Sequence, residues 1–168
     1  MKKKSNNNYY ISLLVAIATL VLIAILIIIF KNDKKFDLNK VKEQFISYYA
    51  DEGLQELEKD NLDYYFQIPS SEIDNSLLLS NFNPYNMDEE KTSHKLLLLL
   101  TDLSIEKVDE YYDSLDGIIY VYTNNDSLDE SISSLYENAI LKRGKSYVYL
   151  IIGEENNIME QELLNLYK

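Results

Sequence analysis

The segment "KLLLLLTD", Lys95 to Asp102, decides the fold class more than any other part of the chain. It is a continuous apolar run bounded by polar residues. A run of this length is typical of a β-strand, whereas a buried helix is usually longer. Because the apolar residues do not alternate with polar ones, the segment predicts a strand that is buried on both faces.

The segment that follows this strand has the pattern of a capped helix. In "SIEKVDEYYDSL", Ser104 is an N-cap residue, and the chain turns at Asp116-Gly117. The expected buried stripe of this helix consists of Ile105, Val108, Tyr112 and Leu115. The next segment, "IIYVYT" (118–123), is rich in β-branched and aromatic residues, and we expect a second strand there.

The C-terminal third predicts a helix, two strands and a last helix. Ser127 and Glu130 form the S-x-x-E capping box of a helix that runs through Ile132, Leu135 and Tyr136. The segment "NAILKRGKSYVYLII" (138–152) predicts two strands joined around Gly144. Apolar residues then recur at helical spacing in a terminal helix, with Met159, Leu163 and Leu166 expected inward.

Before the leucine strand, the segment "FDLNKVKEQFISYYADEG" predicts a helix from Asp37 to Gly53. Its expected buried stripe is Leu38, Val41, Phe45 and Tyr48. We expect "LDYYFQIP" (62–69) to be extended, and 70–94 to be loop with a short strand at "LLLS" (77–80). Strands and helices interleave without βαβ regularity, so the predicted class is α+β, with a mixed or antiparallel sheet packed against helices.

The N-terminal region contains 20 consecutive residues without a charge, Ile11 to Phe30. A helix of that length matches the hydrocarbon core of a bilayer, so we expect a retained transmembrane anchor. The predicted division is a basic tail at 1–10, the anchor at 11–30, a polar joint at 31–35 and one domain at 36–168. We expect a single-pass protein of the cell membrane with an extracytoplasmic C-terminal domain, although the flanking lysines do not favour that orientation.

The order of these segments resembles a family of small bacterial proteins, anchored by a membrane helix or a lipid, that is known only as a domain of unknown function. The resemblance covers 36–168, and its most specific part is the N-A-I-x-x-x-G-x-x-Y-V pattern, Asn138 to Val148. This chain lacks the cysteine of the lipid-anchored members. The resemblance implies export and anchoring, and it implies no catalytic residues.

Charge and composition exclude several function classes. The chain has 28 acidic and 16 basic residues, a net charge of −12, and every acidic residue follows residue 30. Such a surface repels phosphate backbones, so we expect no nucleic-acid partner. The absence of cysteine excludes disulfides and thiolate chemistry. The abundance of Asn, Lys, Ile and Tyr, whose codons are AT-rich, suggests a bacterial source.

Few side chains are candidates for chemistry. His94 is the only histidine, which excludes multi-histidine metal sites, and we expect it to be an exposed loop residue. The stretch Asn124 to Glu130 has oxygens suited to calcium but lacks the EF-hand pattern, and Asp88 to Glu90 is a weaker candidate. Paired tyrosines are compatible with a sugar-binding platform, but codon bias and half-buried helix or strand positions explain them more simply. We therefore expect no catalytic residue, cofactor or metal site.

The remaining candidate is an acidic stripe on the helix after Ser104, which could bind a basic partner or could be a solvated face. Its members are Glu106, Asp109, Glu110 and Asp113. The first functional hypothesis is a non-catalytic module that binds a protein or an envelope component. The second is a cell-envelope hydrolase that uses paired carboxylates, and the third is a cytoplasmic-facing subunit of a membrane complex.

Overall fold

The leucine strand lies at the centre of the fold. The computed structural model describes residues 14–23, 35–83, 93–125 and 130–167. In it, β3 (Lys95–Thr101) is buried at all seven positions, which confirms the predicted strand with two covered faces. Alternate leucines point to opposite faces of a strand, so the run supplies two hydrophobic cores at once.

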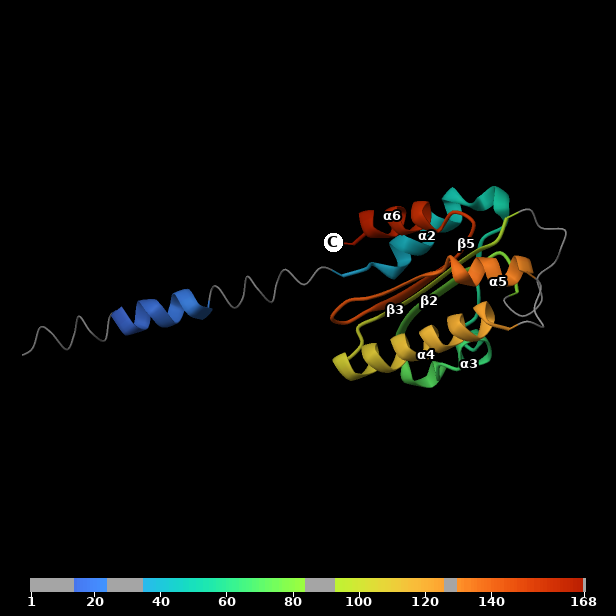
Figure 1. The fold of residues 1–168 in the computed structure, drawn as a ribbon. Helices are drawn as coiled ribbons and strands as arrows, with labels where there is room; N and C mark the ends of the chain where they lie inside the picture. Colours follow the sequence, from blue (N-terminus) through green and yellow to red (C-terminus); the bar gives the residue numbers. More distant parts are fainter. Residues whose placement is uncertain (1–13, 24–34, 84–92, 126–129, 168) are drawn as a thin grey trace, which may run out of the picture. The chain divides into compact units, whose positions relative to one another are not determined.

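The described residues from 35 to 167 form a single α+β domain whose sheet is antiparallel throughout, with strand order β1-β2-β3-β5-β4. The elements in chain order are α2 (Leu38–Tyr48), η1 (Ala50–Glu52), β1 (Gln55–Glu56), α3 (Asn61–Phe66), η2 (Ser70–Glu72), β2 (Asn75–Ser80), β3, α4 (Ile105–Thr123), α5 (Glu130–Glu137), β4 (Ile140–Arg143), β5 (Val148–Gly153) and α6 (Asn156–Asn165). Figure 1 shows α2 and α6 on one side of the sheet and α3 and α4 on the other.

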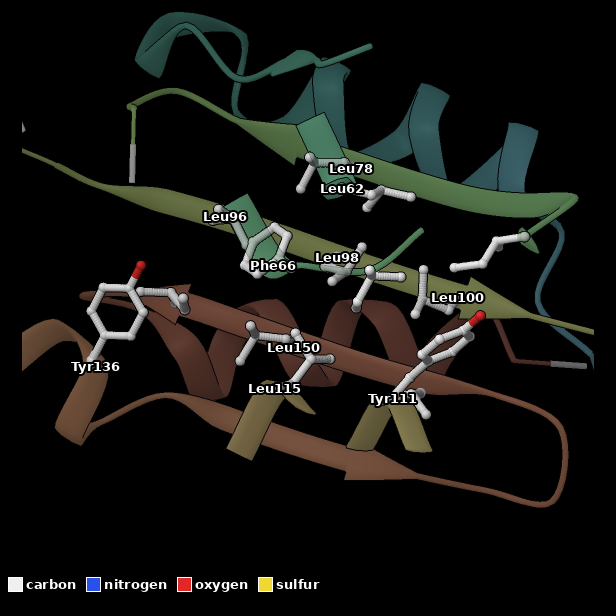
Figure 2. Packing of buried hydrophobic residues seen from close by; sticks show 14 of the residues in the cluster. Leu62, Phe66, Leu78, Leu96, Leu98, Leu100, Tyr111, Leu115, Tyr136 and Leu150 are labelled. Carbon is white, nitrogen blue, oxygen red and sulfur yellow. The ribbon is translucent and has the colours of Figure 1, made fainter. Parts of the chain in front are cut away.

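The even-numbered leucines of β3 face the core under α3, α4 and α5. Leu98 stands in register between Leu78 of β2 and Leu150 of β5, and all three are buried (Figure 2). Helix α4 contributes Leu115 and Tyr111 to this core, as the figure shows. Burying apolar area of this extent is the main stabilising contribution to the domain.

The odd-numbered leucines of β3 face the core under α2 and α6. Leu97 and Leu99 pack there with Phe45 of α2 and Met159 of α6. The predicted terminal helix is confirmed, because Met159, Leu163 and Leu166 are all buried. The two strands predicted around Gly144 are also confirmed, as β4 and β5.

The caps of the two longest domain helices form as the sequence indicates. The Asp37 side chain accepts a hydrogen bond from the backbone N–H of Lys40, and the Ser104 hydroxyl accepts one from that of Lys107. These bonds satisfy N–H groups that have no partner within the helix. Gly53 adopts a left-handed conformation and ends the first helical region, after η1.

The predicted end of the helix after Ser104 is wrong. Helix α4 continues through Gly117 to Thr123, and the expected strand at 118–123 is its last part. The β propensity of this segment is overridden because a helix can bury Ile119 and Tyr122 partly against the core. The predicted extended segment at 62–69 is likewise wrong, since α3 covers Asn61–Phe66 and buries Leu62 and Phe66.

Each of two predicted stripes is wrong at its tyrosine, whereas Val41, Phe45, Val108 and Leu115 are buried as predicted. On α2, Tyr49 is buried and Tyr48 is exposed, although Tyr48 was the expected core residue. On α4, Tyr111 is buried in place of Tyr112, and Ile105 is exposed. Each tyrosine pair offers two rings to the same core, and the helix rotation that best fits the sheet selects one of them.

Within the predicted anchor, the structure describes residues 14–23, which are helical. No helix within the described residues is both long and apolar enough to cross a bilayer. This corrects the expected transmembrane anchor at Ile11 to Phe30, together with the single-pass membrane location and extracytoplasmic placement that depended on it. Residues 11–13 and 24–30 of that segment lie outside the described ranges.

Candidate functional site

The four residues of the predicted acidic stripe lie on α4, but they have different surroundings. Glu106 is exposed in the first turn. Asp109 accepts a hydrogen bond of 2.5 Å from Arg143 of β4. Glu110 lies 3.0 Å from the Lys107 ammonium, which also binds Glu72 at 2.6 Å. The first half of α4 thus has cations from its own chain beside two of its acids.

The ion pairs around Lys107 stabilise its charged form. Hydrogen bonds to Glu72 and Glu110 raise the pKa of Lys107 above its ordinary value. Arg143 is held further by the ring of Tyr112, with its guanidinium carbon 4.6 Å from the ring centroid. These contacts pair Asp109 and Glu110 with cations of the same chain, although such exposed pairs contribute little stability.

The second half of α4 differs, because Asp113 and Asp116 are exposed and have no ion pair within the described ranges. Asp113 lines an open cavity of about 550 Å³ between α3 and α4. We call this cavity the α3–α4 groove. Its other lining residues include Tyr65, Ser114, Gly117, Ile118, Val121 and Tyr122.

The groove presents apolar surface to solvent. Val121 in its lining is 57% exposed, and Tyr64 and Tyr120 on the same two helices are 65% and 68% exposed. Since Ile118 and Val121 are three residues apart on a helix, they share one side of α4. An apolar helix side that its own domain leaves uncovered is typical of an interaction surface.

A second polar arrangement lies at the start of β3 and centres on Lys95. The Lys95 side chain is 1% exposed, and its ammonium lies 2.8 Å from Glu52, 2.9 Å from Glu155 and 2.9 Å from the Ser93 hydroxyl. The Ser93 hydroxyl donates to Glu52 at 2.6 Å, and the ammonium also lies over the ring of Tyr49. We call these five residues the Lys95 cluster.

The Lys95 cluster contains a serine beside a lysine, a pair that can form a nucleophile and base. That chemistry requires a neutral lysine. Burial opposes the charge of Lys95, but hydrogen bonds to Glu52 and Glu155 outweigh burial and raise its pKa. The pKa of Glu52 is lowered, because its hydrogen bonds from Lys95 and Ser93 outweigh burial. Lys95 therefore stays protonated and is unsuited to act as a base.

His94 is not the exposed loop residue that the sequence predicts, since its side chain is only 12% exposed. Its backbone N–H and its Nδ1 lie 2.7 and 3.0 Å from the two carboxylate oxygens of Glu154, and Phe82 packs edge-on against its ring. In the described part of the chain, no hydroxyl is hydrogen-bonded to the His94 Nε2. His94 and Glu154 form a histidine–carboxylate pair. Among the described residues, no hydroxyl group contacts this pair in the way that the nucleophile of a catalytic triad would.

A second, more polar cavity of about 500 Å³ adjoins this pair. Glu154, Glu155 and Asn156 line it, together with Ser134 and Asn138 of the α5 region. Its carboxylates are about half exposed and are engaged by His94 and Lys95. A carboxylate hydrolase needs one acid that is free to donate a proton, and the ion pairs of this cavity do not supply that arrangement.

The described residues contain no group of three or more His, Cys, Asp or Glu side chains placed to hold a metal ion. In the predicted calcium stretch, the Asn124 amide donates to the carbonyl of Tyr120 and caps α4. Residues 126–129 of that stretch, and the weaker candidate at 88–90, lie outside the described ranges.

No protein-family model, curated protein sequence or solved structure matches this chain. The resemblance to a bacterial family of unknown function therefore stays a prediction, and the function has to be argued from the geometry.

The α3–α4 groove is not apparent from the sequence, because the pattern predicts that the helix ends at Gly117. The sequence does contain one indication of the groove: in "GIIYVYT" (117–123), five consecutive residues are apolar or aromatic. If such a segment continues an existing helix, only part of its circumference can face the core, and an exposed apolar side must result.

Proposed function

We propose that this protein is a non-catalytic binding module that recognises an apolar, basic segment of another protein in the α3–α4 groove. The observation that carries the proposal is the second half of α4, where exposed apolar side chains and unpaired carboxylates occur together. The occupant is a protein segment because a groove of about 550 Å³ formed along a helix suits several consecutive side chains.

The residues that line the α3–α4 groove indicate that part of the occupant is apolar. Ile118 and Val121 offer aliphatic surface, and Tyr65 of α3 and Tyr122 of α4 contribute ring surface. Tyrosine combines a large apolar ring with a hydroxyl group, and for that reason it is enriched at protein interfaces. Covering these side chains would remove the apolar surface that the domain leaves in water.

The basic part of the occupant follows from charge complementarity. Asp113 lies in the groove lining and Asp116 lies one turn along the same helix, whereas Asp109 and Glu110 have cations of their own chain. A lysine or arginine of the partner would supply the missing countercharge. Complementary charges of this kind raise association rates and specify the partner.

Binding of defined synthetic peptides to the full chain tests the proposal. The probes are helical peptides of about 15 residues with leucine at helical spacing and lysine between, a matched set with glutamate for lysine, and one with serine for leucine. Fluorescence anisotropy of labelled peptides should show binding of the basic apolar set alone. The affinity should fall when the salt rises from about 0.05 M to about 0.5 M, because the Debye length shrinks to a few ångströms.

Two variants with the same change of charge locate the binding surface. Asp113→Lys should weaken the basic peptide at least about tenfold, because it replaces an attraction by a repulsion. Glu43→Lys, an exposed position on α2 across the sheet, should stay within about twofold of wild type. Equal binding of the lysine and glutamate peptides, or equal effects of the two variants, would overturn the proposal. Circular dichroism confirms that both variants fold.

A further inference from the structure

Gly117 lies in the middle of α4, where glycine destabilises a helix relative to alanine. The other three glycines have reasons within the chain. Gly53 adopts a left-handed conformation, and a Cβ on Gly144 or Gly153 would collide with the Tyr147 ring or with the His94 carbonyl. At Gly117 the backbone is ordinary helix and an added Cβ would meet nothing within 4 Å.

The position of Gly117 suggests what the missing side chain makes room for. Gly117 lines the α3–α4 groove, and Ser114 lines it one turn earlier. Ser114, Gly117, Ile118 and Val121 follow one another at spacings of three, one and three, which places them on one side of α4. That side therefore has two small residues at one end and two apolar residues at the other.

We infer that the occupant of the groove is an α-helix that crosses α4 at Gly117, with its backbone close to that of α4 and its apolar residues against Ile118 and Val121. A glycine lets another backbone approach more closely than any side chain allows. Asp113 and Asp116 precede Gly117 by four residues and one residue in the sequence, so the crossing places basic residues of the partner helix beside them. This inference rests on the proposed binding function and specifies the conformation of the partner.

At position 117, helix stability favours alanine, whereas the proposed helix crossing requires glycine. Gly117→Ala should raise the melting temperature by about 3 °C, because alanine is the better helix former. It should weaken the basic apolar peptide about tenfold or more, because the new methyl group occupies the crossing point. Ser47→Ala, at an exposed position near the end of α2 across the sheet, is the matched control and should leave affinity unchanged.

A second probe tests the helical conformation directly. The same basic apolar peptide with a central proline keeps its charge and most of its apolar residues but cannot form a continuous helix. It should bind the full chain about tenfold more weakly than the parent peptide. If the proline peptide binds as well as the parent, or if Gly117→Ala binds within twofold of wild type, the helix crossing is wrong. The proposed function survives that result, because it fails on other outcomes: no preference for the lysine over the glutamate peptides, or equal effects of Asp113→Lys and Glu43→Lys.

Discussion

The Lys95 cluster and the α3–α4 groove are built from similar residue types, but their partners differ. In the cluster, the Lys95 ammonium is surrounded by Glu52, Glu155 and Ser93 of its own chain at 2.8 to 2.9 Å. In the groove, Asp113 has no cation among the described residues, and Val121 is uncovered. A polar group that is satisfied internally stabilises the fold, whereas one left beside exposed apolar surface is available to a partner.

The comparison also explains why a chain rich in acids has so few candidate sites. Several acids among the described residues are already paired with Lys or Arg, as Glu72 and Glu110 are with Lys107. In the second half of α4, unpaired acids lie beside a cavity. Function is therefore better located by missing partners than by the number of charges.

The largest expected effect is the loss of stability on replacing Lys95 in the Lys95 cluster. Lys95→Met keeps an unbranched apolar stem but leaves the carboxylates of Glu52 and Glu155 facing each other without a cation. The free energy of unfolding should fall by about 3 kcal/mol, at the low end for a broken buried pair because both carboxylates can reach water. Urea unfolding monitored by circular dichroism measures it. Lys142→Met, on the exposed side of β4, should change stability by less than about 0.5 kcal/mol.

A loss below about 1 kcal/mol for Lys95→Met would mean that the cluster adds little stability. The lysine would then need a different explanation, and the contrast with the groove would disappear. A double variant that adds Glu155→Gln to Lys95→Met should recover part of the loss, since it removes one of the two facing charges.

The next effect concerns the groove and should appear in binding rather than in stability. Val121→Ser removes exposed apolar surface, so the free energy of unfolding should stay within about 0.5 kcal/mol of wild type. Binding of the basic apolar peptide should weaken about tenfold, which corresponds to roughly 1.4 kcal/mol. Ile105→Ser is the matched control, because Ile105 is 75% exposed on the first turn of the same helix. Similar losses for the two variants would show that binding is not localised to the groove.

Sequence alone was sufficient for the centre of the fold. The run of leucines at β3 permits few structures other than a strand covered on both faces, and the register places each leucine opposite an apolar residue of β5. The two C-terminal strands and the last helix were also predicted correctly, because turn residues and helical spacing agree there. These are segments in which local preference and burial favour the same structure.

Sequence was insufficient where local preference and burial disagree. The segment 118–123 has strand-forming residues but lies in α4, since the helix that starts at Ser104 already packs on the sheet and can extend. The same error concealed the candidate site, because the groove exists only if Gly117, Ile118 and Val121 share a helix side. The pairing of Lys95 with Glu52 and Glu155 was not predictable either, since it depends on contacts across 43 and 60 residues of chain.

A smaller effect follows from the pKa values in the cluster. The pKa of Glu52 is lowered in the folded state by hydrogen bonds from Lys95 and Ser93, despite burial. A carboxyl whose folded pKa lies below its unfolded pKa contributes stability that is complete above the unfolded value and is lost as the pH falls through the folded value. The wild-type protein should therefore lose more stability than Glu52→Gln between about pH 5 and pH 2.

Unfolding by urea at a series of pH values measures this difference, and Glu43→Gln on the exposed side of α2 is the control, which should follow the wild type. Because the Glu52 side chain is about one third exposed, the difference should be smaller than the effect of Lys95→Met. A Glu52→Gln profile parallel to that of the wild type below pH 5 would contradict the pairing.

The smallest expected effect tests the one member of the cluster whose polar atom has no partner in the described ranges. The Tyr49 hydroxyl is buried without a hydrogen bond, whereas the Tyr149 hydroxyl donates to Glu160 at 2.7 Å. Tyr49→Phe keeps the ring under the Lys95 ammonium and removes the unsatisfied group, so stability should be unchanged or rise by about 0.5 kcal/mol. Tyr149→Phe should cost about 1 kcal/mol, because it leaves the Glu160 carboxylate without its donor. Equal losses in urea unfolding would mean that the Tyr49 hydroxyl has a partner in solution, and the cluster would then extend beyond the five residues that define it.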